Sequence, residues 1–355
     1  MKRILSICLV LAMLVTLSAC GGNAPAEDNG GETTTTTTTT TASEATTTTT
    51  AADTTTTTIE EGTTVPTTEN TTTTTEVTTT TTTTTTAAPT TTATKNHGNV
   101  PKSIKILAVG NSFSVDAMRH HLYDMLAAAG CTDIHLGILY IGGASLDTHY
   151  EHIRRNQAKY QYQENKDGSW TYTDNYRAAD AFALADWDIV TVQQVSGHSG
   201  RGTTYNNLDA LVDLIRPQIG DAKLYWHMTW AYQKDSTHAD FGYYNKDQMK
   251  MYKSIVRATN DKIVGNEDFV GIIPSGTTIQ NLRTSSLGDT LTADGYHLLD
   301  TYGDYAAALT WFCFFTGADA ETMTYRPTFI ADHFDEIAEA VNNAIKTPLA
   351  ITECK

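Results

Sequence analysis

The stretch Ile104-Lys105-Ile106-Leu107-Ala108-Val109-Gly110-Asn111-Ser112-Phe113-Ser114 decides the fold of this 355-residue chain. Its nearly continuous apolar part is typical of a central strand in a parallel sheet with both faces covered. From Val115 to Ala129 apolar residues recur at helical spacing, and Gly130 is placed to end that helix. We therefore expect Ser112 at the carboxyl end of a strand and near a helix N-terminus. Open α/β sheets bind ligands there, and backbone N–H groups at such a place stabilise a developing anion.

A second polar stretch, Thr292-Ala293-Asp294-Gly295-Tyr296-His297, precedes a helical run from Leu298 to Phe315. It supplies a carboxylate and an imidazole at the spacing Asp-x-x-His. This spacing allows Asp294 to hold one ring nitrogen of His297 while the other nitrogen faces a serine hydroxyl. The competing interpretation is an aspartate that starts a helix beside an incidental surface histidine.

The alternation of strands and helices between residues 101 and 355 predicts one α/β domain with a parallel sheet between two helical layers. The expected strands cover residues 104–109, 133–140, 188–193, 222–228 and 269–273. Between the second and third strands, the alternating segment Tyr160 to Tyr176 carries an Asp-Gly turn, which predicts an inserted β-hairpin.

Gly-Asn-Ser at a strand end, followed late in the domain by Asp-x-x-His, resembles the SGNH (GDSL-like) hydrolase superfamily. Gly142-Gly143-Ala144-Ser145-Leu146 resembles the second block of that family, and Asp188 to Ser196 lies where the third block belongs. Together with Pro274-Ser-Gly-Thr-Thr-Ile-Gln, these motifs resemble one bacterial branch of SGNH-type domains over residues 104–317. The usual Gly-x-Asn of the third block is absent here.

The resemblance implies a flavodoxin-like three-layer α/β/α sandwich with a five-stranded parallel sheet, and a serine esterase that often removes acetyl groups from carbohydrates. Ser112 is then the nucleophile, His297 the general base and Asp294 the residue that orients the base. The oxyanion is expected to be held by the N–H groups of Ser112 and Gly143. A side-chain donor has to come from Gln193, Gln194 or Ser196, and Gln194 is our first choice.

The chain opens with Met1-Lys2-Arg3 and an apolar segment to Leu17, which predicts a secretion signal over residues 1–19. Cys20 after Leu-Ser-Ala resembles the lipobox of bacterial lipoproteins, which implies a lipid on its thiol; an ordinary signal with a chance cysteine is the alternative. Residues 20–100 are dominated by threonine and carry too few large apolar side chains to fold, so we expect a disordered stalk. The expected location is extracytoplasmic, on the cell surface and tethered to the membrane.

Residues 101–355 carry 31 acidic and 21 basic residues. This net charge of about −10 argues against nucleic acid as a partner and is compatible with a neutral acylated carbohydrate. Cys131, Cys313 and Cys354 have neither metal spacing nor a disulfide framework. His149 and His152 are spaced like metal ligands, but we expect them on a solvated helix face. No metal or cofactor is expected, and we expect a monomer.

Two non-enzymatic alternatives remain from the sequence. In the first, the same cleft binds glycans without turnover, and the altered third block marks lost activity. In the second, the threonine-rich stalk carries the biological role, and the domain is displayed like an adhesin.

Overall fold

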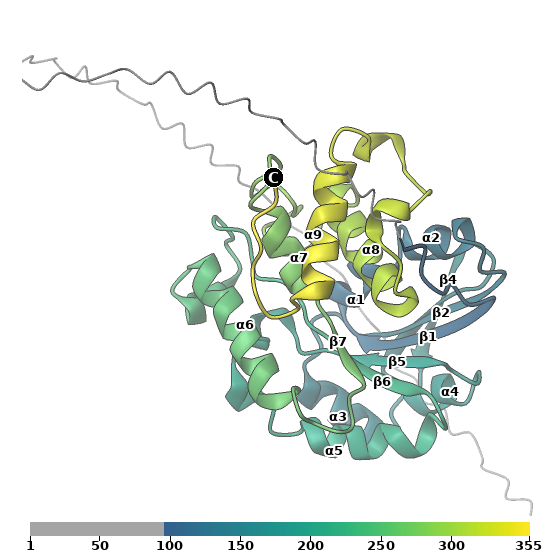
Figure 1. Ribbon diagram of the computed structural model, residues 1–355. Coiled ribbons are helices and arrows are strands. Elements are labelled where there is room, and N and C mark those ends of the chain that lie inside the picture. Colours follow the sequence, from purple (N-terminus) through teal and green to yellow (C-terminus); the bar gives the residue numbers. More distant parts are fainter. Residues whose placement is uncertain (1–95) are drawn as a thin grey trace, which may run out of the picture. The chain divides into compact units, whose positions relative to one another are not determined.

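A seven-stranded mixed sheet forms the centre of the computed structural model, which describes residues 96–355 (Figure 1). The expected secretion signal, Cys20 and almost all of the threonine-rich segment lie outside the described residues. The strand order is β4 (Trp170–Tyr176), β3 (Tyr160–Asn165), β2 (Asp133–Tyr140), β1 (Ser103–Gly110), β5 (Ile189–Val192), β6 (Lys223–His227) and β7 (Gly271–Ile273).

Five neighbouring strands of the sheet, β2, β1, β5, β6 and β7, are parallel to one another, which confirms the predicted parallel sheet. The predicted hairpin over residues 160–176 also forms, but it is part of the same sheet: β3 pairs antiparallel with β2, and β4 pairs antiparallel with β3. The sheet therefore has two more strands than the sequence predicted. The addition has a physical reason, because β2 would otherwise expose an unpaired edge.

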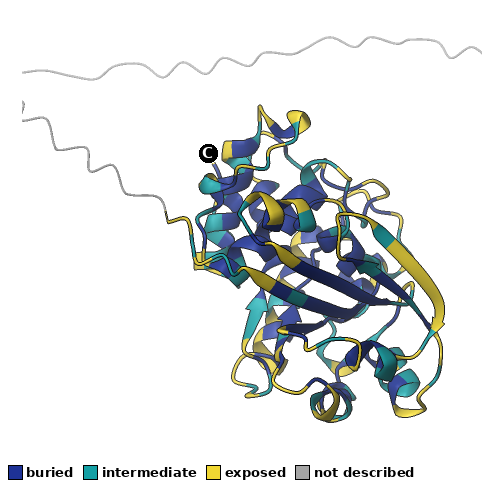
Figure 2. Ribbon diagram, turned by 90° about the vertical axis from the view of Figure 1, so that its right-hand side faces the viewer, coloured by how far each residue is buried: buried dark blue, intermediate teal, exposed yellow. Residues whose placement is uncertain are grey.

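Helices cover both faces of the sheet and give the predicted three-layer sandwich (Figure 1). One layer holds α1 (Ser112–Met118), α2 (Leu122–Ala128), α7 (Ser275–Leu282), α8 (Tyr302–Thr316) and α9 (Phe334–Lys346). The other holds α3 (Leu146–Arg154), α4 (Ala178–Phe182), α5 (Leu208–Ile215) and α6 (Gln248–Lys262). The central strands are buried, whereas the edge strand β4 is largely exposed (Figure 2). Within residues 96–355, no helix is both long and apolar enough to cross a membrane.

Two helical segments differ from the sequence-based prediction. The single helix expected over residues 115–129 is divided into α1 and α2, and α1 begins earlier, at Ser112, because the Asn111 side chain accepts the N–H of Phe113 and caps the helix. Helix α7 was not predicted. All of its residues are buried, so it lacks the amphipathic pattern by which surface helices are recognised.

Buried histidines belong to the core of this fold. His149 is buried and bonds the Tyr160 hydroxyl through Nδ1 at 3.1 Å, so the expectation of a solvated face at this position was wrong. His227, at the end of β6, lies 3.0 Å from Gln193 Oε1 through Nδ1 and 3.1 Å from the Ser275 hydroxyl through Nε2. Burial lowers the pKa of His149 and of His227 to about 3, so both stay neutral in the folded protein at moderately acidic pH.

We expect His227→Gln to reduce the acid sensitivity of folding. Below about pH 6.5 His227 binds a proton in the unfolded chain but stays neutral in the folded chain. This one group therefore lowers the free energy of unfolding by about 1.4 kcal/mol for each pH unit of acidification. Urea denaturation should therefore show that the stability difference between wild type and variant shrinks by about 2 kcal/mol from pH 7 to pH 5. Parallel pH dependences of the two proteins would contradict this account.

Candidate active site

The structure brings Ser112 and His297 into contact, although 185 positions separate them in the sequence. Ser112 is the first residue of α1, directly after the carboxyl end of the central strand β1. Its Oγ lies 2.8 Å from His297 Nε2, and His297 Nδ1 lies 2.7 Å from Asp294 Oδ2. A hydroxyl, an imidazole and a carboxylate are therefore connected in one line of hydrogen bonds. This arrangement supports proton transfer from the hydroxyl to the imidazole.

The Asp294 carboxylate also fixes the turn on which His297 lies. Its Oδ1 accepts the backbone N–H groups of Tyr296 at 3.1 Å and His297 at 2.8 Å. Partial burial pushes the pKa of Asp294 upward, but the hydrogen bonds from His297 and Tyr296 outweigh burial and hold it below its usual value. The turn needs a glycine directly after Asp294, because Gly295 has a φ of +91° and a Cβ there would lie 3.0 Å from the Ser236 backbone.

Backbone carbonyls of the same turn are held from outside it. The N–H of Gln233 donates to the Gly295 carbonyl at 2.8 Å, and Trp230 Nε1 donates to the Tyr296 carbonyl at 2.8 Å. Both donors follow β6, so the carboxyl end of that strand positions the imidazole. Trp230 is fully buried, so its role here is to support the turn.

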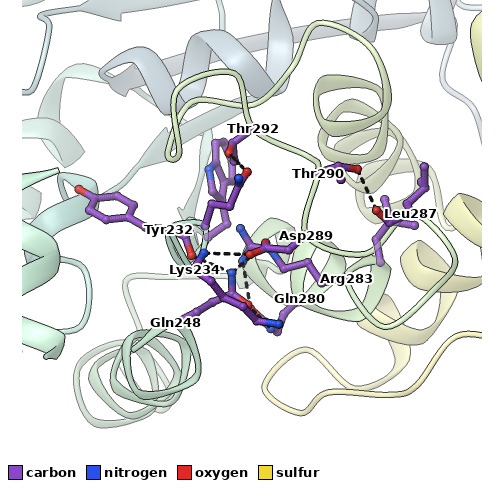
Figure 3. Close-up of polar contacts among 12 residues, drawn as sticks. Tyr232, Lys234, Gln248, Gln280, Arg283, Leu287, Asp289, Thr290 and Thr292 are labelled. Carbon is purple, nitrogen blue, oxygen red and sulfur yellow. Dashed lines mark hydrogen bonds and ion pairs between the residues drawn. The ribbon is translucent and has the colours of Figure 1, made fainter. Parts of the chain in front are cut away.

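A buried ion pair anchors the segment that leads into this turn (Figure 3). Asp289 Oδ1 lies 2.8 Å from Arg283 Nε and accepts from Gln248 Nε2 at 2.9 Å, while Oδ2 accepts the backbone N–H of Lys234 at 2.8 Å. The Arg283 side chain is 3% exposed. Burial lowers the pKa of Arg283 to about 10, so the guanidinium remains charged at neutral pH.

A buried polar network lies beneath the candidate nucleophile. Gln193 Nε2 donates to Asn111 Oδ1 at 2.7 Å, and Gln193 Oε1 accepts from the Ser114 hydroxyl at 2.6 Å. Asn111 Nδ2 in turn donates to the Ala144 carbonyl at 3.0 Å. The network joins the ends of β1 and β5 to the loop after β2, and it holds Ser112 and Gly143 on the same side of the sheet.

A pocket of about 250 Å³ opens at Ser112 and His297. Its other lining residues are Asn111, Phe113, Tyr140, Gly142, Gly143, Val195, Ser196, His238 and Tyr296. Among residues 96–355, the backbone N–H groups of Ser112 and Gly143 have no hydrogen-bond acceptor. Gly143 has a φ of +64°, which favours glycine. Two free donors therefore lie beside the candidate nucleophile, as an oxyanion site requires.

The family model described as Domain of unknown function (DUF4886) matches residues 105–345. The chain belongs to the DUF4886 family. A DUF4886 family protein from Bacteroides uniformis ATCC 8492, known from a crystal structure, is 42% identical with a TM-score of 0.68; the match covers 71% of this chain and 98% of that one. The described domain therefore corresponds to nearly the whole of that relative.

Two further solved structures are more distant. A protein from Slackia heliotrinireducens, proposed to be an SGNH hydrolase, is 21% identical over 59% of this chain and 97% of its own, with a TM-score of 0.39. The acetyl xylan esterase AlAXEase is 16% identical over 59% of this chain and 99% of its own, with a TM-score of 0.37. The comparison with curated proteins gave no match.

The three candidate side-chain donors of this DUF4886 domain have different surroundings. The Gln194 amide donates to the carbonyl and hydroxyl of Thr204 at 2.9 and 3.2 Å, so our first choice is turned away from the pocket. Gln193 is in the buried network described above. Of the three, only Ser196 lines the pocket, where its Oγ lies 2.8 Å from the Tyr232 hydroxyl. The orientation of the Gln194 amide thus depends on Thr204, a loop partner that the sequence does not reveal.

Other groups in the described part of this DUF4886 domain offer little for metal chemistry. Within residues 96–355, no three His, Cys, Asp or Glu side chains converge as a metal site requires. Cys131, Cys313 and Cys354 are buried and unpaired, and burial raises the pKa of each thiol. Sequence reasoning missed the positioning roles of Asn111 and Gln193, although both lie inside motifs that it had singled out.

We expect Asp289→Ala to lower the free energy of unfolding by about 3–5 kcal/mol, because it leaves the buried Arg283 charge without its partner. Urea denaturation at neutral pH measures the change. The matched control is Asp180→Ala, which removes the partner of Arg177 from a pair whose side chains are 49% and 44% exposed, and which should stay close to wild type. Equal losses in the two variants would contradict the structural importance of the buried pair.

Proposed function

We propose that this DUF4886 domain is a serine esterase that removes acetyl groups from a carbohydrate. The observation that carries the proposal is the line of hydrogen bonds from Ser112 through His297 to Asp294, with distances of 2.8 and 2.7 Å. Such a line gives a nucleophile, a general base and the carboxylate that orients and stabilises the base. The sequence motifs that resemble the SGNH superfamily assign the same roles to the same residues.

The reaction follows from the chemistry of these groups. His297 takes the Ser112 proton as the serine oxygen attacks the ester carbonyl, and the negative charge moves to the carbonyl oxygen. The free N–H groups of Ser112 and Gly143 stabilise this oxyanion. His297 then protonates the leaving alcohol, and the acyl group stays on Ser112. Finally His297 removes a proton from water as the water attacks the acyl-enzyme. It gives this proton to the Ser112 oxygen when the bond to the acyl group breaks, and the acid leaves.

Two features of the pocket support an acetylated sugar as the proposed substrate. Its volume of about 250 Å³ is modest, which fits an acetyl group better than a long acyl chain. The Tyr296 ring lies 4.7 Å from the His238 ring and 4.2 Å from the His297 ring, so aromatic surfaces flank the nucleophile. Aromatic side chains with polar tips offer both a flat apolar face and hydrogen-bonding groups to a sugar.

The proposal includes a location, which rests on the sequence alone. A lipid on Cys20 tethers the chain to the outer face of a membrane, and the threonine-rich segment holds the domain away from the bilayer. We further propose that the domain works as a monomer, without metal or cofactor, on an acylated carbohydrate outside the cell.

We expect Ser112→Ala to reduce acetate release by at least about a thousandfold, because it removes the covalent route. The measurement is acetate release by the purified full chain from acetylated xylan, acetylated sialic acid and peptidoglycan, with 4-nitrophenyl acetate as a generic probe. The control Ser169→Ala changes an exposed serine in the β3–β4 turn and should keep full activity. If folded wild type and Ser112→Ala are equal on every substrate, the esterase proposal is overturned, and glycan binding without turnover becomes the better account.

We also expect Ser196 to be the third oxyanion donor, so that Ser196→Ala lowers kcat by about a hundredfold. Tyr232 is well placed to donate to Ser196 Oγ, which leaves the serine proton for the oxyanion. The matched control is Ser199→Ala, a buried serine of the same loop whose hydroxyl bonds the Ser196 carbonyl and which does not line the pocket. Equal kcat values for both variants would exclude Ser196 from this role.

A further inference from the structure

Asp116 connects the helix of the candidate nucleophile to the segment of the candidate base. It lies four residues after Ser112 on α1, so the two side chains share one helix face. Asp116 Oδ2 accepts the backbone N–H of Leu298 at 3.0 Å, while Ser112 Oγ meets the neighbouring His297 ring at 2.8 Å. One face of α1 therefore contacts two consecutive residues of the distant loop.

This attachment complements the contacts already described. Asp294 holds His297 from within the turn, and Gln233 and Trp230 hold carbonyls of the turn from the end of β6. None of these contacts relates the imidazole to α1. The Asp116 carboxylate does so directly, because its hydrogen bond fixes Leu298 against the same helix that presents the serine hydroxyl.

The surroundings of Asp116 make its charge sensitive to pH. It is partly buried, and the buried Asp304 of α8 lies nearby. Asp304 Oδ2 lies 2.5 Å from His120 Nδ1, and Asp304 Oδ1 has no hydrogen-bond partner among residues 96–355. Burial first, and then the Asp304 charge, raise the pKa of Asp116 to about 7, against the Leu298 N–H and the charges of His297 and His120. The charged or titratable groups that surround this cluster are Arg119 and His120 directly after α1, His297 and Asp300 in the loop, and Asp304 on α8.

We propose that Asp116 is a positioning residue for the esterase reaction: its carboxylate holds the segment 297–298 so that the imidazole stays on Ser112, and its charge stabilises the imidazolium that forms. The inference rests on the proposed function. The Asp294 carboxylate also stabilises a charged imidazole, but Asp294 lies on the same turn as His297. Asp116 adds a second carboxylate that comes from the nucleophile's helix.

A consequence for the pH profile follows. The Asp116 charge is present above about pH 7 and is lost below it, so kcat should rise through this range in wild type. The Asp304 charge raises the pKa of Asp116, and Asp304→Asn should therefore move the rise in kcat to lower pH. A residue with a merely structural role would not move a pH profile in this way.

The test compares two variants of Asp116 in the full chain with 4-nitrophenyl acetate. Asp116→Asn keeps an oxygen that can accept the Leu298 N–H but loses the charge, and Asp116→Ala loses both. We expect kcat at pH 8 to fall about tenfold in the first and about a hundredfold in the second, with KM within about twofold of wild type. Asp116→Asn should also make the rise in kcat near pH 7 shallower, because the Asp116 charge no longer contributes to it. The control Asp213→Asn makes the same chemical change on an exposed face of α5 and should behave as wild type.

A readout independent of turnover separates this inference from the proposed function. Hydrogen exchange of the Leu298 amide, followed by NMR, should accelerate at least about tenfold in Asp116→Ala and stay near wild type in Asp116→Asn and Ser112→Ala. If wild type and Ser112→Ala are equal in activity, the esterase proposal fails, yet the exchange rates still report on the attachment. The role of Asp116 is overturned if folded Asp116→Ala has the same kcat, pH profile and Leu298 exchange rate as wild type.

Discussion

The hydrogen bonds of the Asn111 side chain are the constraint on which the rest of the site depends. Its Oδ1 accepts from the first turn of α1 and from Gln193 after β5, and its Nδ2 donates to the Ala144 carbonyl in the loop after β2. One amide group therefore connects the carboxyl ends of three adjacent strands. A buried amide with its partners satisfied adds specificity, because any shift of one strand end leaves a polar group without a partner.

The segment from Leu291 to Leu299 is held in place by contacts from other parts of the domain. It forms no extended strand or helix, and it is held by contacts from elements far away in the sequence. The ion pair of Asp289 with Arg283 holds its beginning, the residues after β6 hold its middle, and α1 holds its end through Asp116. A loop that carries the proposed general base needs such external support, since a displacement of about 1 Å is enough to impair proton transfer.

The sequence was sufficient for the parts of this domain that depend on local pattern. Continuous apolar runs identified the five parallel strands, and the spacing of Asp294 and His297 indicated their mutual contact, which the structure shows. Other features depend on partners that no local pattern reveals. The direction of the Gln194 amide is set by Thr204, helix α7 is buried on all sides, and β3 joins the sheet because β2 has an open edge. In each case tertiary contacts decide between structures that the sequence leaves equally open.

The separation between Ser112 near the start of the domain and His297 near its end has a consequence for biosynthesis. A chain is made from its N-terminus, so β1 and α1 are complete long before the residues after β7 exist. The pocket wall that Tyr296 and His297 provide is missing throughout that interval. A truncated or partly synthesised chain therefore carries Ser112 without His297, and the reaction proposed above would begin only when synthesis of the domain is nearly finished.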